Sequence, residues 1–199
     1  VGEGDVMSWQ LPTWLESMVL VGAGARLGAV QNPMLPIYRD REVGFIVRQA
    51  GAKVLVVPGE WKGFDFGAMA RGIAADLPAM QVVVVDRDLP DGDPASLPAL
   101  PAGAAEPFVP GVRTDGPWRW IFYTSGTTAD PKGARHTDKT VGASAYTMAA
   151  AFELAPDDRN ALVFPFTHIG GIGWLFAGLM AGCPHIIVEA FIPDSTIPV

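Results

Sequence analysis

Apolar residues in the first part of the chain form short continuous runs, separated by stretches in which they recur every three or four positions. The continuous runs are typical of buried strands, at Asp5–Gln10, Ala29–Pro33, Lys53–Val57 and Gln81–Val85. The periodic stretches predict helices, which run from Pro12 and Thr13 to Leu27, over Tyr38–Gly51 and over Phe64–Leu77. Strands alternating with helices are the pattern of parallel βα units, so residues 1–86 predict a first βα block.

Residues 87–117 break this pattern, because they contain seven prolines together with several Gly and Asp residues. Such a composition predicts a long irregular connection between two blocks. The second block, residues 118–199, opens with an aromatic and β-branched strand at Trp118–Tyr123. Thr137 is a candidate N-cap for a helix over Asp138–Phe152.

The segment Asn160–Val188 carries no formally charged residue and is long enough to cross a bilayer. Glycines and prolines interrupt it, however, and strands of a parallel sheet are apolar throughout because both of their faces are covered. We therefore expect a strand at Ala161–Phe164, a buried helix at Ile169–Ala181 and a strand at His185–Val188, with no transmembrane span.

Composition narrows the function classes. The chain has 199 residues, of which 49% are hydrophobic, and a formal net charge of -7, which argues against nucleic acid and anionic membranes as partners. A single cysteine, Cys183, excludes an internal disulfide framework and favours a cytoplasmic location. The acidic start, Val1–Asp5, does not resemble a signal peptide and lacks an initiator Met, which suggests a fragment or a processed product. A homo-oligomer is a further possibility.

After the strand at Trp118–Tyr123 comes a loop rich in hydroxyl residues that ends in a lysine: Thr124, Ser125, Gly126, Thr127, Thr128, Ala129, Asp130, Pro131, Lys132 and Gly133. Backbone N–H groups in such a turn, with hydroxyls and a lysine beside them, suit a polyphosphate. The loop is not the usual P-loop, because Gly133 stands where that motif needs Ser or Thr. The alternative is a polar strand-to-helix turn that binds nothing. A single N-cap, however, needs fewer hydroxyl residues than this loop contains.

A second glycine-rich stretch, Gly22–Gly28, imitates a dinucleotide-binding fingerprint. That fingerprint requires a strand directly before the glycines, whereas here a helical pattern comes first. We expect these glycines to let a helix pack closely rather than to bind a nucleotide.

The chain has three histidines. His168 follows a buried strand in Pro165–Gly171, where a lone histidine among apolar residues is more often structural than functional. We expect His136 to be exposed and without chemistry, and His185 to be structural. No metal-ligand spacing and no Gly-x-Ser-x-Gly elbow occurs, so neither a metal site nor a serine hydrolase is predicted.

The run Tyr123–Gly133 closely resembles the phosphate-loop motif of the adenylate-forming superfamily, which includes acyl-CoA synthetases, aryl-CoA ligases, luciferases and peptide-synthetase adenylation domains. Ala129 departs from that motif, which usually has glycine there. The resemblance implies that the phosphates of ATP are bound by Thr124, Ser125, Gly126, Thr127, Thr128 and Lys132. The stretch Pro165–Gly171 resembles the next motif, which implies that His168, Gly170 and Gly171 line the acyl-carboxylate site.

The resemblance implies an α/β fold, with layered, mainly parallel sheets flanked by helices, as in the large N-terminal domain of these enzymes. It also implies a two-step ligase that uses ATP, Mg²⁺ and CoA, with a small-molecule carboxylic acid as substrate. Gly170, Gly171 and Gly173 leave room that bulkier residues would fill, which favours a long or bulky acyl group such as a fatty acid. An aryl acid or a luciferase-like substrate is the alternative. The adenine, ribose and hinge motifs and the C-terminal domain are not found, so we expect an internal piece that is inactive alone. A non-catalytic nucleotide-binding or scaffold module is the rival interpretation.

Overall fold

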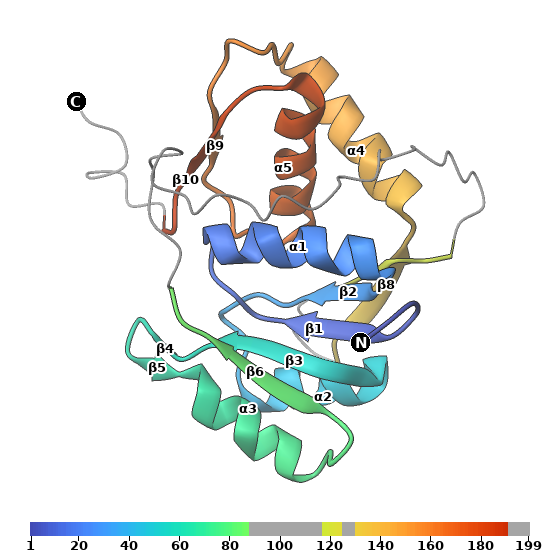
Figure 1. Cartoon of the computed structure of the whole chain (residues 1–199), viewed down its shortest axis with the longest axis vertical. Coiled ribbons are helices and arrows are strands. Elements are labelled where there is room, and N and C mark those ends of the chain that lie inside the picture. Colours follow the sequence, from blue (N-terminus) through green and yellow to red (C-terminus); the bar gives the residue numbers. More distant parts are fainter. Residues whose placement is uncertain (88–116, 125–129, 191–199) are drawn as a thin grey trace, which may run out of the picture.

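The computed structural model describes residues 1–87, 117–124 and 130–190, which form a central sheet with helices on both faces and a smaller layer above it (Figure 1). The elements are, in chain order, β1 (Val6–Trp9), α1 (Leu15–Leu27), β2 (Val30–Pro33), α2 (Asp40–Ala50), β3 (Ala52–Pro58), β4 (Glu60–Trp61), β5 (Phe64–Asp65), α3 (Phe66–Ala75), β6 (Gln81–Val85), β7 (Trp120–Thr124), β8 (Lys132–His136), α4 (Asp138–Ala151), β9 (Asn160–Leu162), α5 (Ile169–Ala181) and β10 (His185–Ile187).

The central sheet has six strands in the order β6-β3-β1-β2-β7-β8. Neighbouring strands are parallel except for the last pair, in which β8 runs antiparallel to β7. Strands β9 and β10 form a separate parallel pair beside α5. The predicted fold class, a mainly parallel α/β sheet with flanking helices, is confirmed. Strand β7 of the second block pairs with β2 of the first, so one sheet spans both blocks.

Each face of the sheet has its own hydrophobic core. Successive residues of β3 alternate between them: Val54 and Val56 belong to the core shared with α1, α4 and α5, and Leu55 and Val57 to the core shared with α2 and α3. Full burial of such side chains stabilises the fold by roughly 1.5–3 kcal/mol each. Coverage on both faces explains why these strands are apolar without interruption.

The uncharged segment forms β9, α5 and β10, as the sequence predicts, although β9 ends at Leu162 rather than Phe164 and β10 ends at Ile187 rather than Val188. Helix α5 matches its predicted bounds. Among the described residues, no helix is long and apolar enough to cross a membrane.

Strand β8 was not predicted, because Lys132–His136 contains polar and small residues where a buried strand would be apolar. It lies at the edge of the sheet, where charged side chains are tolerated because one flank is open to water. The hydroxyl-rich loop therefore joins two antiparallel strands rather than a strand to a helix. His136, expected to be exposed, is half-buried at the end of β8.

The glycines between Gly22 and Gly28 lie within α1 and at its end, and no strand leads directly into them, so the dinucleotide-binding interpretation is excluded. Gly28 caps the helix with a φ of 67°. A Cβ on Gly24 would lie 2.7 Å from Met7 Cε. At Gly24 the glycine therefore serves close packing of the helix on the sheet, as predicted.

Candidate functional site

The two ends of the hydroxyl-rich loop are held together by the β7–β8 ladder. Thr124, the last residue of β7, pairs with Lys132, the first residue of β8, and both are exposed. Directly opposed residues of an antiparallel pair project to the same face of the sheet, so the hydroxyl and the ammonium share one face. The predicted phosphate contacts at Ser125, Gly126, Thr127 and Thr128 lie outside the described residues.

Behind this pair, aromatic rings line the same face of the sheet. Phe122 is opposite Ala134, and Trp120 is opposite His136. The rings of Trp120 and Phe122 stack with centroids 5.8 Å apart, and the imidazole of His136 meets Phe122 edge-on at 5.7 Å. These ring contacts hold the three side chains in place on this face of the sheet.

His168 is the N-cap of α5. Its Nδ1 accepts a hydrogen bond from the backbone N–H of Gly170 at 3.0 Å, which satisfies one of the free donors at the start of the helix. Because Nδ1 accepts this bond, Nε2 is the nitrogen through which the ring can donate. The ring itself is exposed and is left with an N–H to donate.

A cavity of about 410 Å³ brings the two predicted motifs together. Its walls come from β2, β7, β8 and the start of α5, and are formed by Pro33, Leu35, Phe122, Tyr123, Thr124, Ala134, His136, Thr167, His168 and Ile169. Thr124 and His168 thus face one space, although they are 44 positions apart in the chain (168 − 124). Lys132, Gly170 and Gly171 do not line this cavity.

Gly171 has a packing role that the sequence did not reveal. A Cβ at this position would lie 2.5 Å from the carbonyl oxygen of Pro165 and 2.9 Å from Phe166 Cα. A Cβ on Gly173 would lie 3.3 Å from Met148 Sδ. The space expected beside Gly171 and Gly173 for a bulky acyl group is therefore filled by the chain itself, and that expectation is corrected.

His136 is the residue of this cavity that the sequence analysis missed. Its position follows from the two-residue alternation of β8, in which Lys132, Ala134 and His136 share a face. Recognising β8 as a strand would have placed it there.

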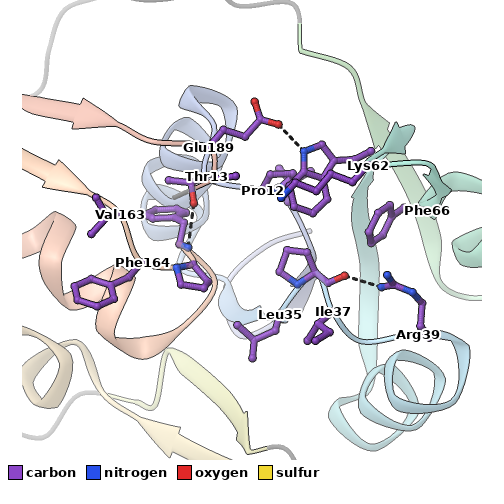
Figure 2. A pocket seen from close by; sticks show the side chains of 16 residues that line it. Pro12, Thr13, Leu35, Ile37, Arg39, Lys62, Phe66, Val163, Phe164 and Glu189 are labelled. Atoms are coloured by element: carbon purple, nitrogen blue, oxygen red, sulfur yellow. Dashed lines mark hydrogen bonds between the residues drawn. The ribbon is translucent and has the colours of Figure 1, made fainter. Parts of the chain in front are cut away.

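A larger cavity of about 510 Å³ lies at the carboxyl ends of β1 and β2 (Figure 2). The connection after β1 crosses one face of the sheet and the connection after β2 crosses the other, which is where α/β sheets commonly bind ligands. Val163 and Phe164 lie on one side of the cavity and Phe66 on the other, with Leu35 and Ile37 between them. Leu35 lines both cavities.

Charged groups at the larger cavity are held by neighbours from distant parts of the chain. Glu189 accepts hydrogen bonds from Trp61 Nε1 at 2.5 Å and Arg87 Nη1 at 2.9 Å, which join β4 to the segment after β10. The guanidinium of Arg39 lies 4.2 Å from the centre of the Phe64 ring. The cavity therefore combines apolar walls with a few oriented polar groups, as ligand sites commonly do.

Two tyrosines connect the smaller cavity to α2 on the opposite face. Tyr123 donates its hydroxyl proton to Gln49 Oε1 at 2.8 Å, and Tyr38 donates to the carbonyl of Tyr123 at 3.5 Å. Burial raises the pKa of Tyr123, opposed by the charge of Arg135, and burial with the charge of Glu42 raises the pKa of Tyr38. Both phenols are therefore neutral hydrogen-bonding groups near neutral pH.

No metal centre is formed within residues 1–87, 117–124 and 130–190, where no group of three or more His, Cys, Asp or Glu residues could hold an ion.

The sheet, its flanking helices and the cavity between two strand ends define the class of the fold, which is that of the N-terminal domain of acyl-CoA synthetases. A model of the family described as AMP-binding enzyme matches residues 1–198. The chain belongs to this adenylate-forming family.

Curated relatives include ligases for different acids. The medium-chain fatty-acid–CoA ligase of Escherichia coli is 27% identical over 99% of this chain, and this chain spans 35% of it. A probable CoA ligase, CCL9, of Humulus lupulus is 31% identical over 92% of the chain, and a salicyl-AMP ligase of Mycobacterium tuberculosis is 31% identical over 89%. The chain spans 34% and 32% of these two relatives, about a third of their length.

Solved structures show the same fold. The inhibitor-bound N-terminal domain of FACL13 from Mycobacterium tuberculosis aligns with a TM-score of 0.69 at 24% identity, over 96% of this chain and 46% of that one. ATP-bound MatB from Rhodopseudomonas palustris aligns with a TM-score of 0.72 at 24% identity, over 98% of this chain and 37% of that one.

Proposed function

We propose that the full-length protein carrying this chain activates a carboxylic acid with ATP and then transfers the acyl group to CoA. In the first step a carboxylate oxygen attacks the α-phosphorus, and pyrophosphate leaves. In the second step the CoA thiolate attacks the acyl carbonyl, and AMP leaves. One observation carries the proposal: Thr124 at the phosphate loop and His168 at the acyl motif line the same cavity.

In this proposal the hydroxyl-rich loop holds the β- and γ-phosphates while the α-phosphate is attacked. Thr124, Ser125, Gly126, Thr127 and Thr128 supply hydrogen bonds, and Lys132 neutralises phosphate charge. These groups act by positioning and by charge stabilisation. Mg²⁺ enters as the complex with ATP.

His168 is proposed to lie beside the acyl carboxylate. Its Nε2–H can donate to a carboxylate oxygen, since Nδ1 is engaged by Gly170. A Cβ on Gly170 would lie 3.1 Å from Nδ1 of His168 and would crowd it. Glycine at this position avoids that contact. Gly171 supports the site by letting α5 approach Pro165.

A fatty acid is the first substrate class we propose, because the larger apolar cavity next to the His168 segment offers walls for a hydrocarbon chain. An aryl acid is the second. It is favoured by the rings of Phe122 and His136 in the smaller cavity and by the likeness to a salicyl-AMP ligase.

The test is to purify the full-length protein and to measure ATP–pyrophosphate exchange over a panel of fatty and aryl acids, followed by acyl-CoA formation. We expect acid-dependent exchange, and thioester only when CoA is added. ATP binding without exchange for any acid would support a non-catalytic nucleotide-binding module instead. The isolated 199-residue chain is expected to show no exchange.

A further inference from the structure

The last two residues of β7 serve opposite faces of the sheet. Tyr123 packs against the core shared with α2, whereas Thr124 lines the smaller cavity on the other face. On β8, Gly133 is opposite Tyr123, and Lys132 is opposite Thr124. A support behind Tyr123 and Gly133 therefore leaves the face of Thr124 and Lys132 free for a ligand.

The ring of Tyr123 occupies the space that a side chain at position 133 would need. A Cβ on Gly133 would lie 2.9 Å from Tyr123 Cζ and 3.2 Å from Tyr123 Cε1, too close for carbon atoms in ordinary contact. Its third neighbour would be Ile121 Cγ2, at 3.0 Å. The ring of Tyr123 therefore covers the backbone of β8 directly after Lys132.

Helix α2 holds this ring by its hydroxyl group. Tyr123 donates its hydroxyl proton to Oε1 of Gln49, the penultimate residue of α2, at 2.8 Å. Burial raises the pKa of Tyr123, partly opposed by the charge of Arg135, so the hydroxyl keeps the proton that it donates. The hydroxyl of Tyr38, which precedes the same helix, donates to the backbone carbonyl of Tyr123 at 3.5 Å.

The other end of the hydroxyl-rich loop returns beside the same helix. Asp130 lines a surface hollow together with Arg41, Arg48 and Gln49 of α2. Both ends of the loop, at Tyr123 and at Asp130, thus border on α2. Gln49 takes part on both sides, through its hydrogen bond to Tyr123 and through the hollow that it shares with Asp130.

We infer that Gln49 is a positioning residue for the phosphate-binding loop and acts through the ring of Tyr123. The hydrogen bond holds the ring in place, and the ring holds Gly133 against β7. Thr124 and Lys132 then keep their separation on the opposite face, without any contact between Gln49 and the nucleotide. The inference rests on the proposed function for its ligand, ATP, whereas the contacts between Gln49, Tyr123 and Gly133 do not.

ATP binding to the full-length protein tests this inference in a double-mutant cycle. Gln49→Ala and Tyr123→Phe break the same hydrogen bond, so each should weaken ATP binding about threefold to tenfold in calorimetry. The double variant should bind ATP no more weakly than the weaker single variant. In pyrophosphate exchange, the KM for ATP should rise while kcat stays near the wild-type value. Gln81→Ala, an exposed glutamine on β6, is the matched control.

A second measurement needs no ligand. Hydrogen–deuterium exchange of the backbone amides should be faster in Gln49→Ala than in the wild type over β7 and β8, and unchanged over β3 and β6. A merely structural role of Gln49 would instead speed exchange in all four strands. Gln81→Ala should leave exchange over β7 and β8 unchanged.

Wild-type ATP affinity in Gln49→Ala would overturn the inference, as would a double variant whose loss equals the sum of the two single losses. Faster exchange over β3 and β6 as well as β7 and β8 would also overturn it. Absence of ATP binding in the wild type would refute the ligase proposal alone. The exchange data would then support or overturn the placement of Thr124 and Lys132 by Gln49.

Discussion

Thr124 and Lys132 are direct partners in the β7–β8 ladder, so one antiparallel pair closes the loop that carries the remaining hydroxyl residues. The pair places a hydroxyl and an ammonium group side by side on one sheet face. Both side chains are exposed, so the pair adds little to the stability of the fold in water. We expect it to contribute binding free energy when an anion is present.

The first prediction concerns this lysine. In the full-length protein, Lys132→Ala and Thr127→Ala are expected to weaken ATP–pyrophosphate exchange by about 1–3 kcal/mol, because charge-assisted hydrogen bonds to phosphate are lost. Lys139→Ala, an exposed lysine on α4, should leave the rate unchanged. Wild-type exchange in both loop variants would exclude the loop as the phosphate site.

The second prediction concerns the packing of α5. Gly171→Ala should lower the free energy of unfolding by about 1–3 kcal/mol, because its Cβ would meet the backbone of Pro165, which cannot move aside cheaply. Gly22→Ala is the contrasting variant, since nothing lies within 4 Å of a Cβ there. In a helix interior it should add roughly 0.5–1 kcal/mol. Urea unfolding of both variants measures the difference, and equal effects would refute this account.

The third prediction concerns the pH dependence of stability. Burial lowers the pKa of His185, only partly opposed by the hydrogen bond of its Nε2 to the carbonyl of Leu175. The unfolded chain therefore binds a proton more readily than the folded chain. Stability is lost as the pH falls below the ordinary histidine value of about 6.5 and levels off below the lowered folded pKa.

His185→Gln keeps a donor for Leu175 but cannot be protonated, so it should lose less stability than the wild type between about pH 7.5 and pH 5. Thermal melts across this range give the comparison. A steeper loss in the variant than in the wild type would show that His185 is not the group responsible.

The fourth prediction separates the two substrate classes. Ile37 lines the larger cavity but not the smaller one, so Ile37→Trp should narrow the space proposed for a hydrocarbon chain. We expect the KM for long fatty acids to rise several-fold, while the KM for short aryl acids stays unchanged. Val19→Trp, on an exposed site of α1, is the matched control. An equal rise for both acid classes would argue against the larger cavity as the acyl site.

Local pattern determined much of the fold. Continuous apolar runs and helical spacing predicted α5 and β6 with their observed bounds, although β6 lies at the edge of the sheet and leaves Val83 and Val84 exposed. Strand β8 was not predicted, because it lies at the edge of the sheet and only one of its flanks pairs with another strand. Polar residues such as Lys132 are favourable on the open flank, so the strand lacks an apolar run.

The sequence by itself determined the residues of the two motifs, their order, and the family they resemble, since each motif is a local run of residue types. Only the tertiary structure decided that Thr124, His136 and His168 face one cavity. It also decided that Gly171 is needed for packing, and that His168 caps α5 by accepting the N–H of Gly170. These relationships depend on contacts between β7, β8 and α5, whose distances are set by packing and cannot be read from spacing along the chain.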